Sequence, residues 1–541
     1  MYLKTLIYLC KLEFVNYKMS NVIILPKILS GKKFLIWGLL LTIVLRIVGV
    51  LVIPLDSDEV MWSVMVDEMV HLRKFYLFFA TQNYSGALES YIILPFQAVF
   101  GITPLVLRIN TIIWSILTSL LIYYIVCNFS SKKWGFIGIL MYNLMSPENF
   151  LVHSKAWANY PFIEFSSLFS FYLLWKWIES KKEKYLLGLG LLVFVSFISN
   201  MQYTFALAIV LGFLFFYLLK ELIKSRKVSF ISLIMLAMSS FIYYLFVKKR
   251  MFFNPLETLR SKLRFSIDED LIRGFDISVI AIIGVFFAIY FLWYAKYKID
   301  ERVRYLKAFL TISAFFFGAF AFYAYLDSFS RVSGGVFNLG SSFNYLTTAI
   351  FPAYLGRFWM LFALPVIFGI VVVLTKIVRN QKLALKDYSL VASFCFPIFF
   401  ALSAVPGLSG SARYLISWWP NLVISTVFFV YYIWKKNRIF SLALFVSLSF
   451  WLFSQGDMLR KVIIGYAKER ESQKKFDTLM VNKINASEAK YCVGDYWKVG
   501  PIMFDAKLKV KCWADKKETR ADYLDFYKYR IDSTDKVYQV E

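Results

Sequence analysis

The sequence has few of the residues that bind metals, carry out redox chemistry or hold nucleotides. Its 541 residues include only two histidines and five cysteines, and their spacing does not resemble a zinc site. It also has no Gly-rich phosphate loop. Acidic residues are fewer than basic ones, 35 against 61, which gives a formal net charge of +26. These shortages argue against a zinc module or a P-loop enzyme. Carboxylates remain as potential ligands, so a divalent metal is possible and metal dependence stays open.

Hydrophobic residues, by contrast, are abundant. They make up 59% of the chain, aromatic residues make up 20%, and long apolar runs recur almost to the end. The basic residues fall in short clusters between these runs, which is typical of cytoplasmic helix ends and not of a nucleic-acid surface. We therefore expect an all-α polytopic transmembrane bundle and no nucleic-acid partner. About 13 spans are predicted, near residues 34–55, 104–126, 134–149, 160–178, 185–200, 203–220, 229–247, 276–295, 306–326, 357–376, 387–406, 413–434 and 438–455.

The distribution of charge predicts the topology. The N-terminal segment, residues 1–33, and alternate short connections are basic, so we expect them to be cytoplasmic. The remaining connections and the tail from about residue 456 then face outwards, across the plasma or inner membrane. Among the outer loops, one basic stretch that includes Lys249 and Arg250 breaks the charge rule. Either a nearby span is miscounted, or these charges bind something.

The tail, residues 456–541, differs in composition from the transmembrane domain, residues 34–455. It is rich in charge, and two short segments around Cys492 and Cys512 alternate between polar and apolar residues, as strands do. A small extracytoplasmic α/β domain is therefore predicted. The two cysteines could form a disulfide on the outer side of the membrane or remain as free thiols.

The most unusual segment is Asp56-Ser57-Asp58-Glu59, which directly follows the first apolar run. Carboxylates are costly inside lipid, so this cluster must lie at the membrane surface or in a wet cavity. Acidic side chains held there suit a general base or a cation site. The alternative is a solvated helix cap, because Asp and Ser are favoured at helix N-termini.

The rest of the first outer loop gives this cluster a context. Apolar residues recur at helical spacing after Val60, which predicts an interfacial amphipathic helix with Asp67 and Glu68 towards water. A second helix is expected from Leu88 to Phe100, and it carries Glu89. Further along the chain, Glu148 and His153 lie at an outer helix end and could join the same cavity.

In this order and topology the chain resembles the GT-C class of membrane glycosyltransferases, the relatives of protein O-mannosyltransferases and lipid A aminoarabinose transferases. The matching elements are Asp58-Glu59 after the first span, the interfacial helix, Gly86-Ala87-Leu88-Glu89-Ser90-Tyr91, Phe100-Gly101, Arg108, and the late pair Arg413-Tyr414 followed by Pro420. The resemblance is best over the first seven spans. Beyond about residue 230 only the general layout matches.

The resemblance implies an inverting transferase that uses a polyprenyl-phosphate-linked sugar donor and a cell-envelope acceptor on the extracytoplasmic face of the membrane. Asp58 would then be the general base, and Glu59 or Asp56 would orient the acceptor or hold a cation. Glu89 could bind substrate or, with Glu59, a divalent metal. Binding of the substrate and its phosphate would involve the residues Arg108, Lys249, Arg250, Arg413 and Tyr414.

Two other classes stay open. A transporter or lipid flippase would be expected to show internal repeats and broken helices in mid-membrane, and the sequence shows no convincing repeat. An outer-leaflet oligosaccharide polymerase or ligase would concentrate its key residues in a large late loop, and residues 327–356 are long enough for one.

Overall fold

The structure of the chain is a computed structural model. It describes residues 32–217, 344–514 and 536–540, with short gaps at 74, 77–78, 80–84, 145–146, 204, 211, 215–216, 356–358 and 403–410. The predictions for Lys249 and Arg250, and for the spans near 229–247, 276–295 and 306–326, lie outside these residues. Contacts divide the chain into two compact units. One comprises residues 1–172, 196–206 and 329–541, and the other comprises residues 173–195 and 207–328.

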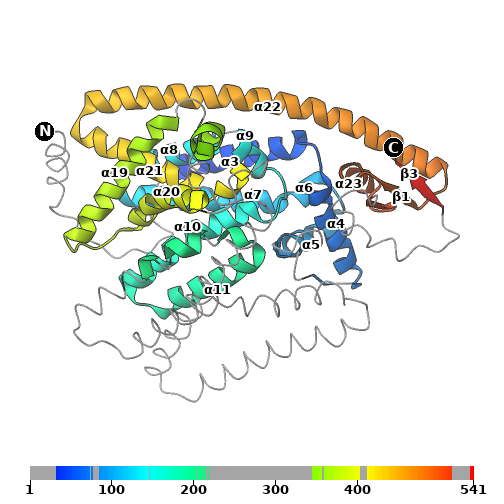
Figure 1. Cartoon of the computed structure of the whole chain (residues 1–541), viewed down its shortest axis with the longest axis horizontal. Coiled ribbons are helices and arrows are strands. Elements are labelled where there is room, and N and C mark those ends of the chain that lie inside the picture. The colour runs from blue at the N-terminus through cyan, green and yellow to red at the C-terminus, as the bar shows by residue number, and fades with distance from the viewer. Residues whose placement is uncertain are drawn as a thin grey trace, which may run out of the picture. The chain divides into compact units, whose positions relative to one another are not determined.

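The described residues are mostly helical, with one small sheet (Figure 1). The helices of the N-terminal half are α3 (Lys32–Val52), α4 (Ser57–Val70), α5 (Leu88–Phe100), α6 (Pro104–Leu107), α7 (Ile109–Phe129), α8 (Lys132–Asn143), α9 (Pro147–Val152), α10 (Tyr160–Ser180), α11 (Glu183–Ser199) and η1 (Met201–Tyr203). Those of the C-terminal half are η2 (Leu346–Ile350), α18 (Phe351–Leu355), α19 (Trp359–Val378), α20 (Leu385–Leu402), η4 (Ser411–Leu415), α21 (Trp418–Lys436), α22 (Arg438–Ala486) and α23 (Tyr496–Asp505).

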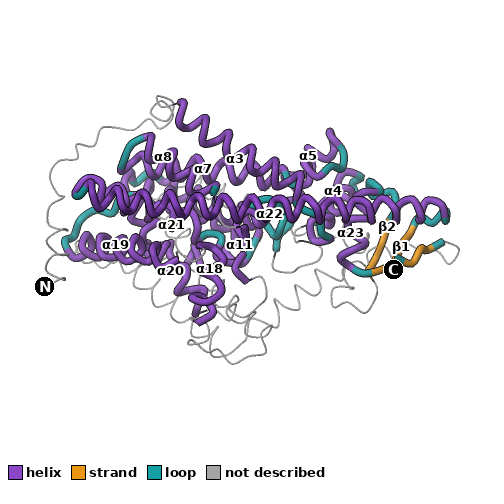
Figure 2. Tube along the Cα trace, turned by 90° about the horizontal axis from the view of Figure 1, so that it is seen from above, coloured by secondary structure: helices purple, strands orange, loops and turns teal. Residues whose placement is uncertain are grey.

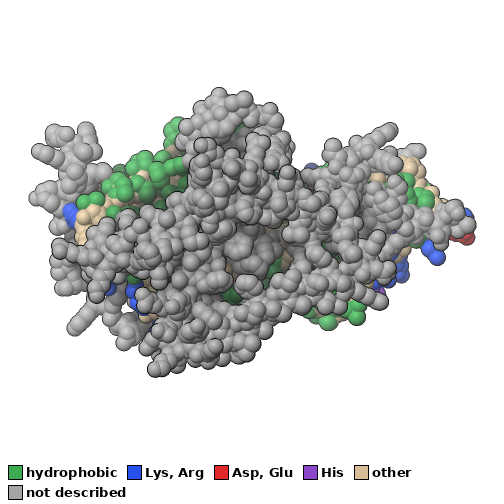
Figure 3. Space-filling view, turned by 60° about the horizontal axis from the view of Figure 1, so that its bottom comes forward, with side chains coloured by type: hydrophobic (Ala, Val, Ile, Leu, Met, Phe, Trp, Pro, Cys, Tyr) green, Lys and Arg blue, Asp and Glu red, His purple; other side chains and the backbone are tan. Residues whose placement is uncertain are grey.

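Four of these helices are long and apolar enough to cross a membrane: α3 from Lys33, α7, α19 and α22. Large apolar side chains are exposed on these helices, among them Ile367 and Leu374 of α19 and Val446 and Phe453 of α22. On the face shown in Figure 3, hydrophobic side chains also dominate the part of the surface that is coloured. Exposed apolar stripes on long helices are typical of a membrane protein. The predicted count of 13 spans is not confirmed.

Two predicted spans differ from the helices that form. The span near 104–126 is divided at Arg108, which ends the short helix α6 and begins α7. The span near 134–149 ends at Asn143, and Pro147 begins a separate helix, α9. Proline favours the first position of a helix and disfavours the interior, so a new start at Pro147 has a physical reason.

The last predicted span, 438–455, is the first part of a much longer helix. Helix α22 has 49 residues and contains no proline, and both Figure 1 and Figure 2 show it running without a break to the small sheet. Beyond its apolar first part, the surface of the helix carries ion pairs between residues one helical turn apart. Lys461 Nζ lies 2.7 Å from Asp457 Oδ2, and Lys475 Nζ lies 2.7 Å from Glu471 Oε1. The tail domain is therefore continuous with the bundle through a helix and not through a loop.

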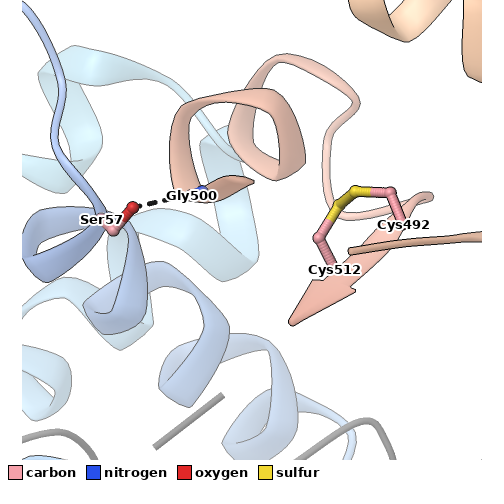
Figure 4. Close-up of a disulfide and its surroundings, with 4 residues drawn as sticks. All are labelled: Ser57, Cys492, Gly500 and Cys512. Atoms are coloured by element: carbon pink, nitrogen blue, oxygen red, sulfur yellow. Dashed lines mark hydrogen bonds between the residues drawn. A yellow bond between two sulfur atoms is a disulfide. The ribbon is translucent and has the colours of Figure 1, made fainter. Parts of the chain in front are cut away.

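The tail contains the three parallel strands β1 (Tyr491–Gly494), β2 (Lys511–Ala514) and β3 (Val537–Gln539), in the order β2-β1-β3. Cys492 and Cys512 are register partners on β1 and β2, and a disulfide joins them (Figure 4). Of the two alternatives left open by the sequence, the structure therefore has the disulfide. The predicted small α/β unit is present.

The first outer loop is more buried than predicted. The second predicted helix matches α5, but Glu68 of α4 does not face water as predicted. Glu68 is fully buried, and the apolar side chains of α4 share one hydrophobic core with α5, α6 and the tail helix α23. The exposure predicted for Glu68 was wrong, and the tail domain, which is distant in sequence, packs against this helix.

Candidate active site

The three carboxylates of the acidic cluster lie at the N-terminus of α4. Asp56 has an extended backbone and caps the helix, because its Oδ1 accepts a hydrogen bond of 2.9 Å from the Glu59 backbone N–H. Asp58 and Glu59 follow in the first turn, where negative charge is favoured by the helix dipole. The cap alternative is therefore true of Asp56, but each of the three side chains also binds a different partner.

Glu59 forms a fully buried ion pair with Arg108. The guanidinium Nε and Nη2 lie 2.7 and 2.6 Å from Glu59 Oε1 and Oε2, and the Ala156 backbone N–H donates to the same carboxylate at 2.9 Å. Arg108 also donates to three backbone carbonyls at the end of α3, those of Val50, Ile53 and Pro54. This pair fixes the start of α4 against the end of α3, which is a positioning role for both residues.

Asp56 faces the turn between α9 and α10. Its Oδ2 accepts hydrogen bonds from Lys155 Nζ at 2.7 Å and from Trp157 Nε1 at 2.8 Å. Burial acts to raise the pKa of Asp56, but Lys155 and the three hydrogen-bond donors outweigh it and lower this pKa below its ordinary value. Asp56 is therefore held as a carboxylate, and Lys155 and Trp157 are held beside it.

The late pair Arg413-Tyr414 reaches this cluster through Trp157. The guanidinium carbon of Arg413 lies 5.7 Å from the centre of the Trp157 ring and 5.3 Å from that of Tyr414. Arg413 also influences Glu148 on α9, whose pKa is raised by burial and lowered in part by that positive charge. The structure thus brings the late Arg-Tyr pair close to the early acidic cluster.

Asp58 points towards the tail domain. The phenol of Tyr496, the first residue of α23, donates a hydrogen bond of 2.6 Å to Asp58 Oδ1. Beside it, Ser57 Oγ accepts a hydrogen bond of 3.2 Å from the Gly500 backbone N–H (Figure 4). The tail domain therefore contacts the acidic cluster directly, and sequence reasoning did not predict this contact.

Glu89 is buried at the start of α5 and exchanges hydrogen bonds with Asn159. Its Oε1 accepts from the Asn159 backbone N–H at 3.0 Å, and its own N–H donates to Asn159 Oδ1 at 3.2 Å. Burial is the main reason that the pKa of Glu89 is raised to about 8, although the Asn159 N–H acts in the opposite direction. At neutral pH this side chain is mostly a neutral carboxylic acid, which is a poor metal ligand.

A second buried network supports the turn that carries Lys155 and Trp157. His153 Nε2 lies 2.5 Å from Glu164 Oε2, and the hydroxyl of Tyr142 donates to the same oxygen at 2.9 Å. His153 Nδ1 lies 2.7 Å from the carbonyl of Asn149. Sequence reasoning missed Glu164 because it lies inside an apolar helix.

Lys155 and Trp157 were also missed, although the sequence contains a signal for Lys155. It is a basic residue in a segment predicted to be an outer loop, where the charge rule makes lysine unusual. Among the residues that the structure describes, no group of three or more His, Cys, Asp or Glu side chains could hold a metal ion.

Comparison with known proteins finds similarity to a family model and to solved structures. A family model described as dolichyl-phosphate-mannose-protein mannosyltransferase matches residues 87–246, which include Glu89, Arg108, Lys155 and Trp157. A solved structure of the Archaeoglobus fulgidus oligosaccharyltransferase in complex with Zn and sulfate matches with 14% sequence identity and a TM-score of 0.46. That match covers 88% of this chain and 61% of the other. No curated protein sequence matches. The match to the mannosyltransferase family model confirms the resemblance to the GT-C class of membrane glycosyltransferases.

Proposed function

We propose that this protein transfers a sugar from a polyprenyl-phosphate-linked donor to a lipid, glycan or protein acceptor of the cell envelope, on the extracytoplasmic face of the membrane. One observation carries the proposal: the acidic cluster after the first span and the late pair Arg413-Tyr414 meet at Trp157. This arrangement places carboxylates and cations side by side at the end of a membrane helix. The family match supports the reaction class.

The reaction needs a base for the acceptor and positive charge for the leaving group. The acceptor hydroxyl attacks the anomeric carbon, its proton passes to a carboxylate, and the bond from that carbon to the phosphate oxygen breaks to release polyprenyl phosphate. One direct attack of this kind inverts the anomeric configuration. Negative charge develops on the departing phosphate, so fixed cations and N–H donors beside it lower the barrier.

Asp58 is our candidate for the base. Both oxygens of Glu59 are engaged by Arg108, and Asp56 is held in its ionised form by Lys155 and Trp157. Asp58 is half-buried in the first turn of the same helix and is bound by a neutral phenol. Asp56 then orients Lys155 and Trp157, and the Glu59–Arg108 pair keeps α4 in place.

Lys155, Arg413 and the indole N–H of Trp157 are our candidates for contacts with the donor phosphate. Both cations lie close to the Trp157 ring: Lys155 Nζ is 4.5 Å and the guanidinium carbon of Arg413 is 5.7 Å from its centre. Tyr414, whose ring centre lies 5.3 Å from the guanidinium carbon of Arg413, is a candidate for contact with the sugar. Lys249 and Arg250 stay in the proposal as further phosphate ligands, on the sequence evidence alone.

Glu89 enters the proposal in its neutral form. A protonated carboxyl at a pKa of about 8 can donate a hydrogen bond to a substrate hydroxyl, which a carboxylate cannot. We propose that Glu89, held by its hydrogen bonds with Asn159, contacts the acceptor or sugar rather than a metal.

The proposal is tested with purified protein in lipid nanodiscs, supplied with a radiolabelled polyprenyl-phosphate monosaccharide and a cell-envelope extract. We expect a glycosidic product and an equal amount of released polyprenyl phosphate. Movement of the donor across liposomes without product would instead support a flippase. Arg413→Gln should raise the KM for the donor by about tenfold, because a hydrogen bond to a charged group contributes ~1.5 kcal/mol or more. The matched control is Arg379→Gln at the predicted cytoplasmic end of α19, which should leave the KM unchanged.

A further inference from the structure

The tail domain provides a side chain to the acidic cluster. Tyr496 is fully buried at the N-terminus of α23, and its hydroxyl donates to Asp58 Oδ1 at 2.6 Å. The helix start is itself fixed, because Asp495 caps α23 by accepting a hydrogen bond of 2.8 Å from the Trp497 backbone N–H. A buried phenol on a capped helix is held in one orientation, and that orientation is towards Asp58.

The same helix approaches the backbone of α4 unusually closely. Ser57 Oγ donates to the Tyr496 carbonyl and accepts from the Gly500 N–H at 3.2 Å (Figure 4). A Cβ atom placed on Gly500 would lie 2.6 Å from Ser57 Cα, a distance that real Cβ atoms essentially never show. Only glycine at position 500 therefore permits this contact, and the contact brings the Tyr496 hydroxyl within reach of Asp58.

The rest of the tail domain supports this contact. Val499, Ile502 and Met503 of α23 share one hydrophobic core with Val60 and Met61 of α4. The disulfide between Cys492 and Cys512 joins the strands on either side of α23 in sequence. The phenol is therefore carried by an element that is packed, capped and cross-linked, and not by a mobile loop.

We propose that Tyr496 is a positioning residue for Asp58, so that the C-terminal domain completes the active site by fixing the general base. This inference rests on the proposed function, because it takes Asp58 to be the base. The phenol hydrogen bond holds Oδ1 of the carboxylate and so restricts the rotamer of Asp58. It also stabilises the charged form of the carboxylate, which is the form that accepts a proton.

The test compares Tyr496→Phe with Tyr491→Phe, a tyrosine on β1 of the same domain. Tyr496→Phe keeps the ring and its packing and removes only the hydroxyl. We expect kcat to fall about tenfold while the KM for the donor changes less than about twofold, because the interaction acts on the base and not on donor binding. The acidic limb of the pH profile should move to higher pH, because a carboxylate that loses a hydrogen-bond donor keeps its proton to higher pH. Tyr491→Phe should change neither quantity.

A double variant separates this inference from the proposed function. If Asp58→Asn lowers kcat about a hundredfold and Tyr496→Phe has the rate and pH profile of the wild type, the positioning role is refuted and the function stands. If Asp58→Asn itself transfers at the wild-type rate, the assignment of the base fails. In the double variant Asp58→Asn/Tyr496→Phe we expect no loss beyond that of Asp58→Asn alone. An additive further loss would mean that Tyr496 acts independently of Asp58, which contradicts the inference.

Discussion

Replacing Arg108 with glutamine should destabilise the protein strongly, although Arg108 lies outside the proposed donor site. Its guanidinium is fully buried and makes two hydrogen bonds to Glu59, at 2.7 and 2.6 Å. Without the guanidinium, the Glu59 carboxylate stays buried and, of the hydrogen-bond donors described above, keeps the Ala156 N–H. Three backbone carbonyls at the end of α3 also lose the donor that Arg108 provides. Breaking one side of a buried ion pair typically costs about 3–5 kcal/mol.

Two further variants test whether the predicted loss of stability comes from the buried Glu59–Arg108 pair. Glu59→Gln/Arg108→Gln removes both charges, so it should recover part of the loss, because no uncompensated charge stays buried. The control is Arg460→Gln on α22, whose partner Asp457 lies 3.0 Å away in a solvent-exposed pair. An exposed pair contributes about 0–1 kcal/mol, so this variant should be close to the wild type.

The measurement is reversible unfolding in lipid or mixed micelles, followed by tryptophan fluorescence against denaturant. The free energy of unfolding should fall in the order wild type, Arg460→Gln, double variant, Arg108→Gln. If Arg108→Gln costs no more than Arg460→Gln, the Glu59–Arg108 pair does not hold α4 to α3, and the described site geometry is refuted.

Three further outcomes are expected. The pKa of Glu89 is raised from 4.5 to about 8, so its contribution to stability is full below about pH 4.5 and is lost as the pH rises through 8. Glu89→Gln should therefore flatten the fall in Tm between pH 5 and 9. An unchanged slope would contradict the raised pKa of Glu89. Cys492→Ser removes the link to Cys512 across a separation of 20 residues and should destabilise the tail domain by about 2–4 kcal/mol, seen as faster proteolysis there. Gly500→Ala should cost about 1–3 kcal/mol by overpacking against α4, whereas Gly465→Ala, with open space around it, should not lower Tm.

The sequence predicted those parts of the fold that depend on local pattern. Apolar runs predicted the long helices α3, α7 and α19, because a run of about 20 apolar residues is a local property. Helix α5 and the strands around Cys492 and Cys512 were found from periodicity and alternation. What local pattern could not show is which surfaces meet. The environment of α4 was predicted wrongly because its cover, α23, is more than 400 residues away in the chain.

The same limit applies to the candidate site. Charge patterning drew attention to Asp56, Asp58 and Glu59, and the resemblance added Arg108 and Arg413. Their division into roles depends on contacts that only the fold brings about: Glu59 with Arg108, Asp56 with Lys155 and Trp157, and Asp58 with Tyr496.

The central claim is that Asp58 removes the proton from the acceptor during sugar transfer. It is tested most directly by the turnover of Asp58→Asn with a radiolabelled polyprenyl-phosphate monosaccharide and a saturating acceptor extract. The control is Asp67→Asn, the same substitution near the other end of α4, where the side chain is partly exposed beside His71. We predict that Asp58→Asn lowers kcat by about a hundredfold or more, as expected for loss of a general base, and that Asp67→Asn stays within about twofold of the wild type. Transfer by Asp58→Asn at the rate of Asp67→Asn would contradict the account.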